Sequence, residues 1–150
     1  MRSFVLLFLV CLVACSSSPL PERARQPLIV ETAGGGARRF EVEFVKSPND
    51  LWTGLRWRTE MAADHGMLFD LGGTHVARFT MSDTLIPLDM LFIAKDGRIL
   101  KIAENTEPGN PGPYTSDGLV RAVLELNAGT SARAGIKTGD QVRHPLFRAH

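Results

Sequence analysis

The feature that most constrains the fold of this chain is a series of short segments in which apolar and polar residues alternate. In the clearest of them, Phe40, Val42 and Phe44 would share one face of an extended chain, and the two glutamates between them would share the other. Alternation with a period of two residues is typical of a strand that is buried on one side only. The segment therefore predicts a half-buried β-strand.

The rest of the sequence carries many strand signals and few helix signals. A short helix is predicted from Pro48 to Arg56, because Ser47 is a suitable N-cap and Pro48 a suitable first helical residue. Strands are also expected at residues 28–31, 76–81, 88–94, 99–103, 119–126 and 141–144, with a hairpin turn at 95–98, a long loop at 107–117 and a helical turn within 128–136. About seven or eight short strands with one or two short helices predict a mainly β protein, folded as a single-domain β-barrel or sandwich.

The N-terminus has the features of a bacterial lipoprotein signal. A single positive charge precedes a short apolar stretch, Phe4–Ala14, which has too few residues to span a bilayer. The stretch runs into Leu12-Val13-Ala14-Cys15, which resembles a lipobox, the pattern at which the signal is cut before a cysteine that carries the lipid. We therefore expect three parts: a signal peptide (1–14), a lipid-anchored flexible tether (15–27) and a single β-rich domain (28–150).

A lipoprotein signal predicts the location of the protein in the cell and its contact with a membrane. The membrane is the expected partner, through the lipid anchor on Cys15, because several acyl chains hold a protein firmly where one does not. Ser16 after the cysteine resembles the sorting pattern for the outer membrane of Gram-negative bacteria. The expected location is the cell envelope, on the periplasmic face of the outer membrane.

The amino-acid composition limits which other classes of partner and cofactor the protein can have. Removing Arg2 with the signal leaves 17 − 1 = 16 Lys and Arg against 16 Asp and Glu, so the sequence predicts no nucleic-acid partner, which would require a basic excess. Both cysteines, Cys11 and Cys15, belong to the signal, which excludes a catalytic thiol or a disulfide in the domain. The histidines lack the spacing of a zinc site. No metal and no cofactor are therefore expected, and a glycan or protein of the envelope is the expected ligand.

Two acidic residues stand among large apolar neighbours and are the first candidates for function. Asp89 would share a strand face with Leu91 and Ile93, and Glu125 lies between two leucines. A carboxylate in such a place must be hydrogen-bonded, paired with a cation or used by a ligand, because its burial alone is costly. Arg78 is a candidate partner for either. If the two carboxylates converge, they could instead act as the acid and the base or nucleophile of a glycoside hydrolase.

The two tryptophans permit two interpretations. Trp52 and Trp57 flank the end of the predicted short helix. Large aromatic side chains supply much of a small hydrophobic core, so we expect them to be packed inside the domain. The alternative is that one is exposed, near Tyr114, and stacks on a sugar ring or holds a peptide.

Six short motifs, in order, resemble the bacterial and archaeal family known as domain of unknown function 192. They are Trp52-Thr53-Gly54-Leu55-Arg56-Trp57-Arg58, Gly66-Met67-Leu68-Phe69, Phe79-Thr80-Met81-Ser82-Asp83-Thr84, Ile86-Pro87-Leu88-Asp89, Leu124-Glu125-Leu126-Asn127-Ala128-Gly129 and Gly135-Ile136-Lys137-Thr138-Gly139-Asp140. The resemblance covers about residues 40–144 and implies a compact β-rich barrel or sandwich. It implies no particular activity.

The chain departs from the family pattern at a few positions. Arg56 stands where the family usually has Met, and residues 80–84 read Thr-Met-Ser-Asp-Thr where the family usually has Trp-Met-Lys-Asn-Thr. Asp83 and Thr84 of this segment are further candidates for ligand binding. The catalytic residues, if there are any, cannot be assigned from the sequence. The preferred function is a binding or accessory module for an envelope component, and the alternative is a hydrolase of envelope glycan that uses the paired carboxylates.

Overall fold

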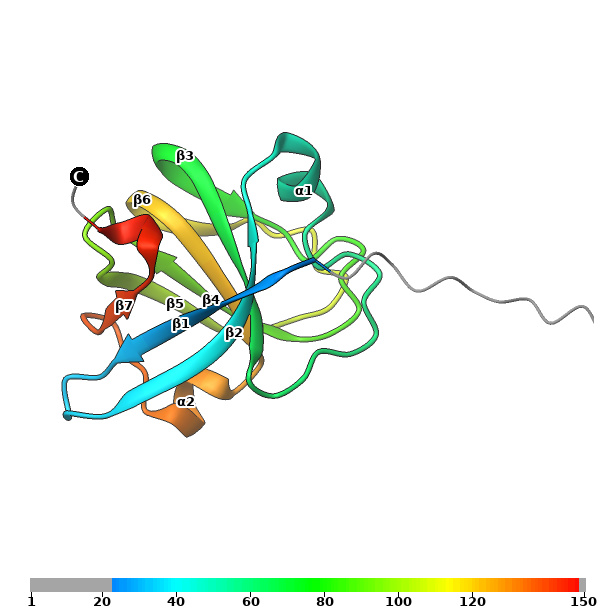
Figure 1. Ribbon diagram of the computed structural model, residues 1–150. Helices are drawn as coiled ribbons and strands as arrows, with labels where there is room; N and C mark the ends of the chain where they lie inside the picture. The colour runs from blue at the N-terminus through cyan, green and yellow to red at the C-terminus, as the bar shows by residue number, and fades with distance from the viewer. Residues whose placement is uncertain (1–22, 149–150) are drawn as a thin grey trace, which may run out of the picture.

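The computed structural model describes residues 23–148, so the predicted signal peptide and the predicted lipidation site at Cys15 lie outside the described residues. The described chain folds into one curled sheet with two short α-helices (Figure 1). The elements are β1 (Arg25–Glu31), β2 (Ala37–Val45), α1 (Pro48–Thr53), β3 (His65–Phe79), β4 (Leu88–Ile93), β5 (Ile99–Thr106), β6 (Tyr114–Asn127), α2 (Thr130–Ala134), β7 (Gln141–Arg143) and the 3-10 helix η1 (Pro145–Phe147). The prediction of a mainly β domain with seven or eight strands and one or two helices is confirmed.

The seven strands form a half-barrel whose two edges come together. Their order in the sheet is β5-β4-β6-β3-β2-β1-β7, and neighbours are antiparallel except for the parallel pair β2 and β3. The edges meet because the turn before β5 bonds to the chain around β7: Ile99 N–H donates to Asp140 O at 2.9 Å, and Val142 N–H donates to Gly97 O at 2.8 Å. The sheet therefore has an enclosed inner face and an outer face.

Apolar side chains fill both faces of the central strands. Leu91 and Ile93 of β4 belong to a cluster that includes residues of β1, β2 and β7, inside the half-barrel. Leu88, Met90 and Phe92 belong to a second cluster on the opposite face, which the α1 region and the segment before β4 cover. All six residues of β4 are buried, as expected of a strand with a core on each side. This second face holds the candidate site described below.

Several predicted boundaries are wrong at the ends of the elements. β1 begins at Arg25, so residues 25–27, predicted as part of the tether, lie in a strand. These residues pair with Glu41–Glu43 of β2, a long-range pairing that the polar and proline-containing sequence does not indicate. Residues 114–117, predicted as loop, form the start of β6, where Tyr114 and Thr115 pair with β3. The helix ends at Thr53 rather than Arg56, because Gly54 has a positive φ of 48°.

The largest difference is β3, which begins at His65 instead of residue 76. Its first half contains glycines, which are unfavourable in a strand unless another backbone must come close. Gly66 meets that condition. A Cβ atom at this position would lie 2.7 Å from the backbone oxygen of Glu125 and 2.7 Å from Leu126 Cδ2. The glycine therefore permits the close approach of β3 to β6, and with it the position of Glu125.

Candidate functional site

Asp89 is completely buried and is held by three backbone N–H groups. Its Oδ1 accepts from Asn105 N–H at 2.9 Å and from Gly129 N–H at 3.0 Å, and its Oδ2 accepts from Ser131 N–H at 2.8 Å. A carboxylate that accepts several backbone bonds is satisfied without a cation. Asp89 therefore ties β4 to the end of β5 and to the turn between β6 and α2, which is a structural role.

The partners predicted for Asp89 are wrong. Arg78, the candidate cation, forms no hydrogen bond with it, and neither does Thr84, which lies close to it in the sequence and was a second candidate partner. The donors come instead from turns distant in sequence, where Asn105 and Gly129 adopt positive φ angles of 51° and 74°. Such left-handed residues can turn N–H groups toward one point, and the sequence around Asp89 does not reveal them.

Glu125 points to the opposite face of the sheet from Asp89. In the antiparallel pair of β4 and β6, Asp89 is opposite Leu126 and Met90 is opposite Glu125. Residues directly opposite each other share a face, and neighbours along a strand alternate. The two carboxylates are therefore separated by the sheet itself. The hypothesis that they form an acid/base pair is wrong, because such a pair must flank one substrate bond.

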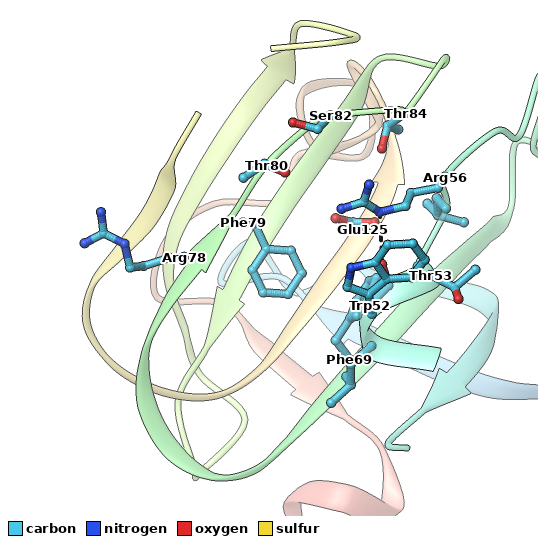
Figure 2. A pocket seen from close by; sticks show the side chains of 13 residues that line it. Trp52, Thr53, Arg56, Phe69, Arg78, Phe79, Thr80, Ser82, Thr84 and Glu125 are labelled. Atoms are coloured by element: carbon cyan, nitrogen blue, oxygen red, sulfur yellow. Dashed lines mark hydrogen bonds between the residues drawn. The ribbon is translucent and has the colours of Figure 1, made fainter. Parts of the chain in front are cut away.

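A pocket opens where Glu125 emerges from the sheet (Figure 2). Its volume is about 280 Å³. It is lined by Leu51, Trp52, Thr53, Gly54, Leu55, Arg56, Phe69, Arg78, Phe79, Thr80, Ser82, Thr84 and Glu125. The lining thus comes from the region of α1, from the middle and end of β3, from the segment that follows it, and from β6.

The α1 wall of the pocket is fixed by hydrogen bonds at the start of the helix. Ser47 Oγ accepts from Asp50 N–H at 3.2 Å and donates to the Asp50 carboxylate at 2.6 Å, a capping arrangement with proline at the first helical position. Arg23 holds the same carboxylate at 2.9 Å. At the other end, a Cβ atom on Gly54 would lie 3.3 Å from the Phe69 ring, so this turn packs directly on the pocket floor.

Arg56 links the walls of the pocket. Its Nη1 donates to Asp83 Oδ2 at 2.7 Å, its Nε donates to Trp52 O at 3.0 Å, and its guanidinium lies 4.7 Å from the centroid of the Trp52 ring. Asp83, a predicted ligand-binding residue, is thus engaged with Arg56. The contact joins the α1 side to the segment between β3 and β4, and Trp57 N–H adds a bond to Asp83 O at 2.8 Å.

The other predicted site residues take different places around the pocket. Thr84 is buried and contributes to the lining. Arg78 is exposed, contributes to the rim, and extends away from Glu125 in Figure 2. The structure therefore brings Glu125, Arg78 and Thr84 to one pocket. Asp83 contacts the lining residue Arg56 but does not itself line the pocket, and Asp89 lies outside it.

The tryptophans are not core residues, contrary to the preferred interpretation. Trp52 is 61% exposed and Trp57 is 50% exposed, and their ring centroids are 6.2 Å apart. Trp52 lines the pocket, and its neighbour lies just outside the lining. The phenylalanines Phe69 and Phe79, which sequence reasoning did not select, complete the aromatic surface with ring centroids 5.1 Å apart. The departures Arg56, Thr80 and Ser82 from the family pattern were the available signal, since all of them line this pocket.

Glu125 has an unusual electrostatic environment. The residue is only 5% exposed, and no group of residues 23–148 forms a hydrogen bond or an ion pair with its carboxyl group. Burial raises the pKa of Glu125 from 4.5 to about 8. At pH 7 roughly nine carboxyl groups in ten are then protonated. The pocket floor is a carboxylic acid that can donate one hydrogen bond and accept others.

Two larger hollows lie beside η1 and lack such a group. One, of about 710 Å³, is bordered by His144, whose ring nitrogens contact Gln26 Oε1 at 3.1 Å and Leu146 N–H at 3.2 Å. The other, of about 920 Å³, includes Lys95, Arg121 and apolar residues of η1. Within residues 23–148, no group of three or more His, Cys, Asp or Glu side chains is arranged to hold a metal ion. In the same part of the chain, no helix is long and apolar enough to cross a bilayer.

The fold and pocket define a half-barrel β domain with a buried acid at a solvent-open hollow. Sequence comparison places it more closely: the chain belongs to the DUF192 family, described as Uncharacterized ACR, which matches residues 29–144. No curated protein shows significant similarity to the chain.

Two similar crystal structures support the assignment to this fold. One, from Sinorhizobium meliloti 1021 and described as a candidate transcription regulator, is 43% identical, with a TM-score of 0.79 over 81% of this chain and 94% of that chain. Another, a protein of unknown function from Novosphingobium aromaticivorans DSM 12444, is 36% identical, with a TM-score of 0.80 over 84% of this chain and 89% of that chain.

Proposed function

We propose that this chain is a lipid-anchored binding module of the cell envelope that holds a small ligand in the Glu125 pocket. One observation carries the proposal: a buried carboxyl group without a partner within residues 23–148 lies on the floor of an open pocket. Buried polar groups are nearly always satisfied, so an exception at a concave surface indicates a place where a ligand supplies the missing bond.

The envelope location rests on the lipoprotein pattern at Leu12–Cys15 and on Ser16. The contacts of Arg23 indicate how the domain is oriented on its tether. Arg23, where the description begins, contacts Asp50 of α1 at 2.9 Å and Glu43 of β2 at 3.5 Å. The domain therefore receives its N-terminal tether beside α1, the helix that forms one wall of the pocket. With a lipid on Cys15, eight residues before Arg23, Arg23 would stay within about 30 Å of the membrane surface.

The alternatives receive less support. A glycan hydrolase that uses Asp89 and Glu125 lacks the required geometry, because the two side chains point to opposite faces of the sheet. The regulator description belongs to the relative from Sinorhizobium meliloti. This chain has 17 Lys and Arg against 16 Asp and Glu, which gives no basic excess for binding DNA.

The test is to fill the pocket and to measure ligand retention. Thr80 is an exposed residue of the lining, so Thr80→Trp should place an indole in the pocket without disturbing the core. The full chain would be purified from membranes and analysed by native mass spectrometry for a bound small molecule. We expect a ligand with the wild type and with the control Thr138→Trp, an exposed site outside the lining, and none with Thr80→Trp. Equal retention by all three proteins, or by none, would contradict the proposal.

A further inference from the structure

We propose that the group received by this pocket is a protonated primary amine, held by the Glu125 carboxylate among the rings of Trp52, Phe69 and Phe79. The inference rests on the proposed function, because it names the chemistry of the ligand for the same site. It follows from a comparison of Glu125 with the other buried acids and from the groups that surround the pocket.

Each of the other buried acids of residues 23–148 has its partners within the chain. Asp89 accepts three backbone N–H groups. Glu43 receives both Nη atoms of Arg58, at 2.5 and 2.6 Å. Asp140 accepts from the backbone N–H groups of Ala33 and Lys137, at 2.9 and 2.7 Å.

Glu125 differs from these acids because its donors are missing from the described chain. A donor must then come from outside, and the carboxyl group faces a pocket through which one can arrive. The Glu125 carboxyl group is thus a hydrogen-bond acceptor inside the pocket, and the ligand would supply the hydrogen-bond donor.

The surroundings favour a cation as this donor. Besides Glu125, the charged side chains that line the pocket are Arg56 from the turn after α1 and Arg78 from β3. Asp83, from the segment before β4, contacts Arg56 outside the lining. Arg56 is paired with Asp83, and Arg78 extends away, so neither guanidinium neutralises Glu125. An anionic ligand would meet an acid at the floor, and a carboxylate that loses its proton there has no countercharge.

The aromatic lining also suits a cation. The faces of aromatic rings attract ammonium and guanidinium groups. Trp52 already carries the Arg56 guanidinium at 4.7 Å, and Phe69 and Phe79 meet edge to face beside the carboxyl group. A pocket of about 280 Å³ accommodates an alkylammonium chain of the size of a lysine side chain.

Binding of an ammonium group must release a proton from the site. The empty site is mainly the neutral acid at pH 7, because burial raises the pKa of Glu125 to about 8. The ammonium ion keeps its own protons, since alkylamines resemble lysine with a pKa of about 10.4. The acid therefore gives its proton to solvent as the charge pair forms. Affinity should rise as the pH increases toward 8, by about 50-fold from pH 6 to pH 8, in proportion to the ionised fraction.

The probe is n-butylammonium chloride, with n-butanol as the neutral molecule of similar size. The mature full chain would be titrated with each at pH 6 and pH 8 by NMR, in parallel with Glu125→Gln and with Glu104→Gln, an exposed glutamate on β5 that serves as the control. We expect n-butylammonium to bind about 50-fold more tightly at pH 8, to bind the Glu104 variant equally well, and to lose at least tenfold in affinity with Glu125→Gln.

Other results separate the two proposals. Equal, pH-independent binding of n-butanol and n-butylammonium would refute the amine while leaving a binding pocket. Binding of neither probe, together with an empty wild-type protein in the Thr80→Trp experiment, would refute the pocket as a binding site. Vesicles with phosphatidylethanolamine, compared with phosphatidylcholine vesicles, distinguish the sources of the group. A primary ammonium on a lipid headgroup would shift the Glu125 resonance only with the former, whereas a soluble amine as the source predicts no shift with either.

Discussion

The unfolding free energy of this protein should fall with increasing pH because of one residue. Burial raises the pKa of Glu125 from 4.5 to about 8, a change of about 3.5 units. Between these values the folded chain keeps a proton that the unfolded chain has lost, so folding is favoured at low pH and this advantage disappears as the pH rises. At 1.36 kcal/mol per unit, the ionised group costs about 5 kcal/mol above pH 8.

Glu125→Gln should remove this dependence. The amide keeps the shape of the side chain and does not ionise. Integration of the two titrations predicts that the wild type loses about 3 kcal/mol relative to the variant between pH 6 and pH 9. The stability difference should be small near pH 5 and should favour the variant increasingly as the solution becomes alkaline.

Urea melts of the mature chain at pH 6, 7, 8 and 9 measure this difference, with Glu104→Gln as the control. Other perturbed groups do not produce the same effect. A hydrogen bond from Ser47 lowers the pKa of Asp50, and one from Lys101 lowers the pKa of Asp117, so both acids remain ionised over this range. Burial lowers the pKa of His144, but His144 is common to all three proteins. Parallel stability curves for wild type and Glu125→Gln would refute the reasoning.

Three further predictions concern other parts of the molecule. Asp89→Ala removes the acceptor of three backbone N–H groups, of which that of Ser131 is buried, and should cost roughly 3 kcal/mol in urea melts. Asp89→Asn should cost less but still destabilise, because its amide must face the Ser131 N–H donor. Ser82→Lys should place an ammonium group in the pocket, lower the pKa of the pocket carboxyl group in NMR titrations, and weaken n-butylammonium binding at pH 8; an unchanged pKa would show that the introduced cation does not reach it. Cys15→Ser should abolish palmitate labelling, and equal labelling of both proteins would disprove lipidation at this residue.

The sequence predicted strands well where one pattern determined their burial. Phe40, Val42 and Phe44 alternate with glutamates, and this segment lies within β2. No strand was predicted for the first half of β3, where glycines are unfavourable in a strand, although Gly66 is needed for contact with β6. The requirement for glycine at position 66 arises from contact with a strand about sixty residues away, and no local sequence pattern indicates it.

The site was predictable in part. Glu125 stood out because a carboxylate between leucines needs an explanation. Its relation to Asp89 depends on the register between β4 and β6, and a shift of one residue in that register would have put both on one face. The solvent exposure of Trp52 could not be predicted from the sequence either, because aromatic character alone does not distinguish a core residue from the wall of a pocket.

Asp89 and Glu125 thus stand in the same kind of sequence pattern but have opposite environments in the fold. The backbone of two distant turns converges on the first carboxylate, while the second faces solvent-accessible space with no donor from the described chain. Domains of this size are stable by about 5–15 kcal/mol, so an ionised Glu125 can consume a large part of that total. An uncharged side chain would remove the cost, and a residue that destabilises its own fold is expected where binding requires it. A cationic ligand would offset this cost by pairing with the ionised Glu125. Binding of the ligand and stability of the domain are therefore linked, and each can be measured through the other.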